Sequence, residues 1–177
     1  MKKLLVIVDM QNDFVNGSLA NPDAEKLVPG IVELIKNWDG EIIATQDRHF
    51  DDYLETQEGK RLPIPHCIYD GKFTGGDIIK DISEALPRRI DDTYIGIFCK
   101  HTFGSTKLGE FIKEEKYDEI YFCGTCTDIC VISNAIMCKS FDPEARIIVL
   151  KDLCAGTTPE NHENALKAMK QCQIDIE

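Results

Sequence analysis

Short apolar runs recur along the chain and are separated by segments of helical period. Five runs are bounded by turn-forming or charged residues, and a weaker sixth lies near the end. These runs predict strands at Leu4–Val8, Ile42–Ala44, Tyr94–Cys99, Ile120–Cys123, Ile147–Leu150 and Ile174–Ile176. Because the runs are apolar at successive positions and not at every second one, they are typical of strands buried on both faces of a sheet.

Apolar residues spaced three or four apart predict helices between these strands. The first three stripes comprise Leu27, Ile31, Leu34, Ile35 and Trp38; Ile78, Ile82 and Leu86, stopped by Pro87; and Leu108, Phe111 and Ile112. Two further helices are expected, one from about Asp128 to Ser140 that buries Ile132, Ala135 and Ile136, and one from about Pro159 that buries Ala165, Leu166 and Met169. Strands that alternate with such helices indicate an α/β protein with a doubly wound parallel sheet and helices on both faces.

The chain has 177 residues and contains no repeat, low-complexity tract or interdomain linker. We therefore expect one domain over residues 1–177, long enough to bury roughly 68–70% of its unfolded surface without disulfides. Ligands of such folds bind beyond the carboxyl ends of the strands. The residues that end the apolar runs there are Asp9, Asp47, Lys100 and the segment Gly124–Cys130.

Charge and hydropathy exclude some partners. The formal net charge is −11, and no Lys/Arg cluster exceeds a pair such as Arg88-Arg89, so nucleic acid and anionic membranes are not expected as partners. The first apolar run has five residues before Asp9, too few for a signal peptide, and no stretch approaches the roughly 20 apolar residues that span a bilayer. A cytoplasmic protein is expected.

Eight cysteines in a reducing compartment indicate core filling, metal binding or catalysis. Cys130 is the strongest candidate for catalysis, since it follows a strand in the first turn of a helix, with Thr127 as the expected N-cap and Asp128 beside it. The helix dipole and free N–H groups there would favour a thiolate and could hold an oxyanion. We expect the others to be inert, with Cys99 and Cys123 in strands, Cys138 and Cys172 in helices, Cys154 just after a strand and Cys67 in a loop.

The pair Cys123-Gly-Thr-Cys126 is formally a CxxC motif, but Cys123 lies inside an apolar run and no second pair completes a zinc site. Asp9 and Lys100 each also have a simpler interpretation. Asp9 could be a strand-end carboxylate that caps a turn, and Lys100 could be a solvated lysine.

A long segment from Arg48 to Asp92 is rich in Gly, Pro and charge, and loops of this length are usually functional or disordered. It opens beside Asp47 and His49 and contains Glu58 and His66, a set that suits a divalent transition metal with open positions. The same residue types are common in surface loops, so a solvated loop stays an alternative. Glu55 competes with Glu58 as the third ligand.

Four motifs at strand ends together resemble the isochorismatase-like cysteine hydrolase superfamily, and within it nicotinamidase/pyrazinamidase-type amidases. The motifs are Asp9-Met-Gln-Asn-Asp13-Phe14, Asp47-x-His49, Lys100, and Gly124-x-x-Thr127-Asp128-x-Cys130-Val131. The resemblance runs in the expected order from Leu4 to about Met169. A true isochorismatase cleaves a vinyl ether without a cysteine nucleophile, so Cys130 favours the amidase branch.

The resemblance implies a three-layer α/β/α fold with a mainly parallel six-stranded sheet, and a catalytic triad of Asp9, Lys100 and Cys130. It also implies a cis peptide bond at Thr125-Cys126 and an oxyanion hole made by the backbone N–H groups of Cys126 and Cys130. The metal ligands that it implies are Asp47, His49, Glu58 and His66. The metal is expected to be zinc, with manganese or iron as alternatives, and the protein is expected to form a homo-oligomer.

The activity that the resemblance implies is hydrolysis of a small carboxamide, nicotinamide foremost, to the carboxylate and ammonia through a thioester. Many nicotinamidases carry a Trp shortly before the last metal-binding His, but Leu62-Pro63-Ile64-Pro65-His66 has none. We therefore expect the nicotinamide ring to pack on Phe14, Phe103 or Leu62. Gln11 and Thr125 are also expected to contact the substrate.

Two alternatives remain. A metal-free cysteine hydrolase of the same superfamily would act on a carbamoyl or ureido compound. A non-catalytic α/β ligand-binding module is more distant, because neither GxGxxG nor GxxxxGK[ST] occurs and the Gly75-Gly76 pair is followed by acidic Asp77.

Overall fold

The computed structural model describes residues 1–72, 74–87 and 94–177. The Arg88-Arg89 pair and the end of the long loop at Asp92 lie outside these ranges. Within them, six parallel strands form one sheet in the order β3-β2-β1-β4-β5-β6. The strands are β1 (Lys3–Val8), β2 (Glu41–Asp47), β3 (Tyr94–Lys100), β4 (Glu119–Thr125), β5 (Arg146–Ala155) and β6 (Asp175–Ile176). The predicted doubly wound α/β fold is confirmed.

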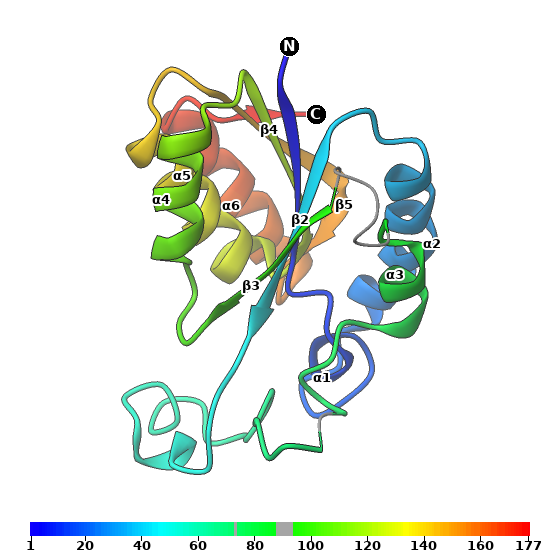
Figure 1. Cartoon of the computed structure of the whole chain (residues 1–177). Helices are drawn as coiled ribbons and strands as arrows, with labels where there is room; N and C mark the ends of the chain where they lie inside the picture. The colour runs from blue at the N-terminus through cyan, green and yellow to red at the C-terminus, as the bar shows by residue number, and fades with distance from the viewer. Residues whose placement is uncertain (73, 88–93) are drawn as a thin grey trace.

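Helices cover both faces of the sheet, as Figure 1 shows. They are α1 (Asn12–Val15), α2 (Pro22–Lys36), α3 (Lys80–Ala85), α4 (Thr106–Glu115), α5 (Ile132–Phe141) and α6 (Pro159–Gln171), with a 3-10 turn η1 (Tyr53–Glu55) and a π-helical turn η2 (Thr127–Val131). The core residues of α4, α5 and α6 pack in one cluster, and those of α1, α2 and α3 pack in another. The two clusters lie on opposite sides of the sheet and make three layers.

The helices α2, α4 and α6 each begin where the sequence supplies a side-chain cap. The Asn21 side chain accepts a hydrogen bond from the Asp23 N–H ahead of α2, and Pro22 is the first residue of that helix. The Ser105 and Thr158 hydroxyls do the same for α4 and α6. These caps satisfy backbone N–H groups that have no partner inside the helix.

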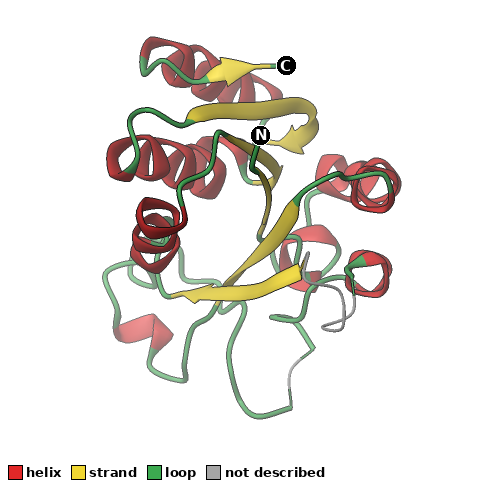
Figure 2. Ribbon diagram, turned by 45° about the horizontal axis from the view of Figure 1, so that its top comes forward, coloured by secondary structure: helices red, strands yellow, loops and turns green. Residues whose placement is uncertain are grey.

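The centre of the sheet is β1, whose residues Leu4–Val8 are fully buried. The connections run from β1 through β2 to the edge at β3, and then return to β4 on the other side of β1. The direction in which strands are added to the sheet therefore reverses between β1 and β4. This is the position at which open α/β sheets form a ligand crevice. Figure 2 shows the strands fanning in a twisted sheet, and Figure 1 shows both termini at the end of the sheet away from the long loops.

Several local predictions need correction. The predicted helix from Asp128 to Ser140 is divided into η2 and α5, and the residue that precedes it is Cys126, so Thr127 is not its N-cap. The Thr127 hydroxyl is instead buried against His162 Nδ1, at 2.8 Å. In α5 the buried side chains are Asn134, Ala135 and Cys138, while Ile132 and Ile136 are half-buried.

Two cysteine positions also differ from prediction. Cys154 lies inside β5, because this strand continues five residues beyond the apolar run that ended at Leu150. Cys172 caps the end of α6 and is exposed. Within the ranges described, no helix combines the length and the apolar character needed to cross a bilayer.

Candidate active site

The carboxyl ends of β1, β2 and β3 bring three charged side chains together. Asp9 follows β1, Asp47 ends β2 and Lys100 ends β3. The Lys100 ammonium lies 2.6 Å from Asp9 Oδ2, 3.4 Å from Asp47 Oδ1 and 3.5 Å from the sulfur of Cys130. All four residues are buried. The residues expected beyond the carboxyl ends of the strands therefore do lie close together. Lys100 is buried, so the simpler interpretation of a solvated lysine is wrong.

Both the main chain and the side chain of Asp9 are held by hydrogen bonds. Its backbone is in the left-handed region at φ 48°, which is uncommon for a residue other than glycine. The Thr45 hydroxyl donates to Asp9 Oδ1 at 2.7 Å and accepts from the Asp9 N–H at 3.2 Å. Burial raises the pKa of Asp9, and the positive charge of Lys100 opposes that rise. A raised pKa makes this carboxylate a stronger base than an ordinary aspartate.

Cys130 lies in η2, with its thiol next to this cluster. Burial, with the nearby charges of Asp9 and Asp47, raises the pKa of the Cys130 thiol well above its ordinary value, and Lys100 only partly offsets the rise. Burial and the neighbouring carboxylates therefore oppose the thiolate that the helix dipole would favour. The thiol needs a base to become a nucleophile, and Asp9 is adjacent.

The segment before Cys130 turns sharply from β4 into η2. The peptide bond between Thr125 and Cys126 is cis, at the position that the family resemblance implied. The Cys126 carbonyl accepts hydrogen bonds from the N–H groups of Ile129 (3.1 Å) and Val131 (3.0 Å). Burial raises the pKa of Cys126 to about 11, so this second thiol is protonated at neutral pH.

A second group of polar side chains lies beside Asp9, Lys100 and Cys130. Asp47, His49, Glu58 and His66, which we call the metal cluster, each offer one ligand atom, and these atoms all lie within 4.8 Å of one another. His49 Nε2 is 2.9 Å from Asp47 Oδ2 and 3.6 Å from Glu58 Oε1, and His66 Nε2 is 3.5 Å and 3.8 Å from the same oxygens. Ligands of one zinc ion lie about 3.4 Å apart in a tetrahedral site. The donor set and its spacing thus fit a divalent metal.

Two further contacts agree with this fit. His66 Nδ1 lies 2.8 Å from the Ile64 carbonyl, a hydrogen bond that leaves the lone pair on Nε2 for a ligand. Burial alone would raise the pKa of Asp47, but the hydrogen bond from His49 and the charge of Lys100 lower it, so this carboxylate is ionised. Glu58 belongs to the cluster whereas Glu55 is exposed, which favours Glu58 as the third ligand.

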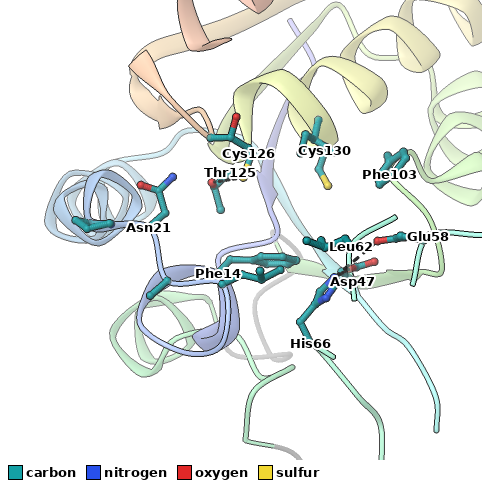
Figure 3. A pocket seen from close by; sticks show the side chains of 15 residues that line it. Phe14, Asn21, Asp47, Glu58, Leu62, His66, Phe103, Thr125, Cys126 and Cys130 are labelled. Atoms are coloured by element: carbon teal, nitrogen blue, oxygen red, sulfur yellow. Dashed lines mark hydrogen bonds and ion pairs between the residues drawn. The ribbon is translucent and has the colours of Figure 1, made fainter. Parts of the chain in front are cut away.

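One cavity of about 390 Å³ connects these groups. Cys130 lines it, and so do Asp47, Glu58 and His66 of the metal cluster. Figure 3 shows the Cys130 sulfur pointing into this space from one wall, with the side chains of Asp47 and His66 on the opposite side. Asp9 and Lys100 do not line the cavity, but Lys100 contacts both the Cys130 sulfur and Asp9. A small molecule in the cavity would meet the thiol and the metal cluster together.

The remaining walls are mostly apolar. Four of the five predicted substrate contacts line the cavity, namely Phe14, Leu62, Phe103 and Thr125. The fifth, Gln11, does not line it, because its side chain is fully buried and bonded to the backbone around Asp47. A substrate contact from Gln11 is therefore not supported.

Some functional positions were missed. Thr157, Ile129 and Asn21 also line the cavity. Thr157 lies two residues beyond the carboxyl end of β5. A sequence prediction that ended β5 at Ala155 would have placed Thr157 among the candidate site residues. Asn134 is fully buried, and its side-chain amide donates to the Cys130 carbonyl at 2.8 Å. No sequence pattern marked it, since a polar residue in a helix is usually exposed.

Comparison with known proteins identifies one family over nearly the whole chain. The isochorismatase domain family matches residues 3–176. A nicotinamidase of Saccharomyces cerevisiae is 27% identical over 216 residues that cover 98% of each chain, and a nicotinamidase/pyrazinamidase of Mycobacterium tuberculosis is 25% identical over 98% of this chain and 97% of its own.

Solved structures are similar in fold. The pyrazinamidase of Pyrococcus horikoshii in complex with zinc superposes with a TM-score of 0.81 at 24% identity, covering 100% of this chain and 99% of its own. PnC1 from L. infantum in complex with nicotinate superposes with a TM-score of 0.83 at 20% identity, covering 99% and 92%. At these identities the likeness supports the architecture alone.

Proposed function

The chain belongs to the isochorismatase domain family, and from this premise we propose that it is a cysteine-dependent amidohydrolase that converts a small carboxamide, nicotinamide foremost, to the carboxylate and ammonia. We propose also that residues 1–177 act as one domain. The observation that carries the proposal is that Cys130 and three members of the metal cluster line the same cavity. The names of the relatives, nicotinamidase and nicotinamidase/pyrazinamidase, support the substrate class.

The first half of the reaction forms an acyl-enzyme. Asp9 accepts the thiol proton of Cys130 while the sulfur attacks the amide carbonyl carbon, and the carbonyl electron pair moves to the oxygen. Backbone N–H groups of Cys126 and Cys130 are proposed to stabilise that oxyanion. The carbonyl then reforms, the C–N bond breaks, and the departing nitrogen takes the proton from Asp9 and leaves as ammonia.

The second half hydrolyses the thioester. Asp9, ionised again, accepts a proton from a water that attacks the acyl carbon. The C–S bond then breaks, the sulfur recovers the proton from Asp9, and the acid leaves. Lys100 keeps its positive charge throughout, since burial would lower its pKa but Asp9, Cys130 and Asp47 raise it. Its role is to offset the negative charge that moves between Asp9 and the sulfur.

The metal cluster is proposed to hold a divalent transition metal through Asp47, His49, Glu58 and His66. A bound ion would supply a Lewis acid to a substrate atom or water in the cavity. The protein's own part is to keep Asp47 ionised, to orient the four ligands, and to give the substrate an apolar wall at Phe14 and Leu62. Zinc is the first choice, with manganese or iron as alternatives, because two imidazoles and two carboxylates suit all three.

The test is release of ammonia from nicotinamide, pyrazinamide and a small ureido compound. We expect the native protein to turn over an aromatic carboxamide and Cys130→Ala to lose turnover while keeping its fold by circular dichroism. Cys126→Ala is the matched control, a second cavity thiol whose side chain has no proposed role, and it should retain turnover. A Cys130→Ala protein with a native rate would disprove the nucleophile, and turnover of only the ureido compound by metal-free protein would favour the metal-free alternative.

A further inference from the structure

We infer that Gln11 and Asp13 are positioning residues for the metal cluster, although neither is a candidate ligand. Both lie in the segment that follows β1, and they contact the main chain on two different sides of the cluster. The inference rests on the proposed metal binding, and it names the residues that keep the ligands correctly positioned.

Gln11 pairs with the peptide groups on both sides of Asp47. Its side-chain oxygen accepts from the Asp47 N–H at 2.7 Å, and its side-chain nitrogen donates to the Asp47 carbonyl at 2.9 Å. The same nitrogen also donates to the Gly76 carbonyl at 2.7 Å. Because the Gln11 side chain is fully buried, water cannot replace these bonds. The N–H and the carbonyl of Asp47 are therefore both bonded to this one amide, on the side of β2 away from its partner strand β3.

Asp13 holds the chain segment that carries His66. Its Oδ2 accepts from the N–H of Cys67, the residue after His66, at 2.7 Å. Cys67 has φ 48°, a left-handed conformation that costs free energy in a residue other than glycine. The bond to Asp13 satisfies an N–H in that strained turn and so fixes the direction in which His66 leaves the backbone.

Cys67 also connects the two histidines. Its carbonyl accepts from the His49 N–H at 3.0 Å, and the His49 carbonyl accepts from the Tyr69 N–H at 2.8 Å. The chain segment that carries His66 is thus bonded to Asp13 on one side and to His49 on the other. Gln11 and Asp13 together connect the segment after β1 to three of the four candidate ligands.

This arrangement matters because metal–ligand distances tolerate little error. Zinc binds nitrogen and oxygen at about 2.0–2.2 Å, so a backbone shift of a few tenths of an ångström weakens a ligand. Residues that orient ligands through hydrogen bonds typically change metal affinity by roughly 10- to 100-fold when they are replaced. We expect Gln11 and Asp13 to fall in that range.

The test measures Zn²⁺ affinity of the full chain by competition with a chromophoric chelator. Gln11→Met keeps the size of the side chain and removes its hydrogen bonds, and we expect roughly 10- to 100-fold weaker binding. The matched control is Gln46→Met. Gln46 also donates to the Gly76 carbonyl from a buried position, but none of its side-chain bonds reaches the peptide groups of Asp47. Its replacement should change the affinity much less.

Two changes test the other side of the cluster. Asp13→Ala removes the acceptor for Cys67, and Asp13→Asn retains an oxygen that can accept the same bond, so Asn should restore part of the affinity lost in Ala. In Gly75→Ala a Cβ would overlap the Asp13 carboxylate, which displaces that side chain without removing it. This variant should weaken Zn²⁺ binding as well.

The outcomes separate the inference from the proposal beneath it. If native protein binds no Zn²⁺, the metal part of the proposed function fails and the inference falls with it. If native protein binds and Gln11→Met binds equally well, or Gln46→Met loses as much as Gln11→Met, only the positioning role is overturned. Circular dichroism of each metal-free variant checks its fold, and Gln11→Glu, which keeps the acceptor for the Asp47 N–H and loses the donor, replaces Gln11→Met if that protein does not fold. The same comparison with Gln46→Met then decides the result.

Discussion

Lys100 Nζ lies 2.6 Å from Asp9 Oδ2, although the strands that carry the two residues are not neighbours. The lysine reaches across the end of β2, where it also meets Asp47, and it donates to the sulfur of Cys130. One buried ammonium therefore faces two carboxylates and a thiol. Its removal would leave these groups without a compensating charge.

We predict that Lys100→Met moves the acidic limb of the pH profile to higher pH. Lys100 lowers the pKa of both Asp9 and Cys130, so without it both pKa values rise. Asp9 must be ionised to accept the thiol proton, and a higher pKa means that this form appears only at higher pH. The measurement is kcat/KM for the best amide as a function of pH.

The same substitution should also destabilise the protein, since breaking a buried ion pair costs about 3–5 kcal/mol. Urea unfolding measures this loss. Lys2→Met, which removes an exposed ion pair with Glu115, is the control and should cost about 1 kcal/mol or less. An unshifted acidic limb in a folded Lys100→Met protein would contradict the electrostatic role.

Removal of the metal should lower both activity and stability. After dialysis against a chelator we expect turnover to fall and the melting temperature to drop, because a metal that binds only the folded state stabilises it. At a free concentration 100 times its Kd, the stabilisation is about 2.7 kcal/mol. Adding Zn²⁺, Mn²⁺ or Fe²⁺ back separately shows which ion restores activity.

His66→Ala is the companion variant, since it removes a ligand whose Nε2 faces Asp47 and Glu58. It should respond to added metal less than the native protein does. Full turnover in metal-free native protein would speak against any role of a metal in the reaction.

Phe14 should contribute to substrate binding more than to the chemical step. It lines the cavity, and its ring centroid lies 5.5 Å from that of His66. Aromatic stacking is worth about 0.5–1.5 kcal/mol, so Phe14→Leu should raise KM for an aromatic amide roughly 2- to 12-fold. KM for a small aliphatic amide, which cannot stack, should change less. Metal content is measured in parallel, and an equal rise for both substrates would contradict stacking.

Gly124 should be irreplaceable by alanine at the centre of the sheet. It has φ 116° and pairs in register with Val8, and a Cβ on it would overlap the Val8 carbonyl. We expect Gly124→Ala to lower the free energy of unfolding by more than the roughly 1–3 kcal/mol of backbone strain alone. Gly71→Ala is the control, because Gly71 has φ 81° but its Cβ would meet no atom within 4 Å. Equal losses in urea would show that the contact with Val8 is unimportant.

Much of the fold was predictable, because strands buried on both faces are recognisable in the sequence as runs of consecutive apolar residues. The end of β5 was not predicted, since Lys151 and Asp152 interrupt the run and the strand continues through them. The π-helical turn at Thr127–Val131 was also missed. Its geometry depends on packing against α6 and on the Thr127–His162 bond, and neither leaves a local pattern.

The candidate site was predictable where topology decides it. Asp9, Asp47, Lys100 and Cys130 all follow from the rule that ligands bind at the carboxyl ends of strands. Gln11 was expected to contact the substrate, and its position just after β1 does not reveal its partners. Its actual partners, Asp47 and Gly76, are 36 and 65 residues away in the chain, a pairing that only the folded chain reveals.

The sheet order has a practical consequence for handling the protein. Asp9, Asp47, Lys100 and Cys130 come from four separate stretches of chain that meet only when β3, β2, β1 and β4 lie side by side. We therefore expect any fragment that lacks one of these strands to be inactive in the proposed reaction. Turnover then serves as a sensitive assay of correct refolding after denaturant, specific for the central strands.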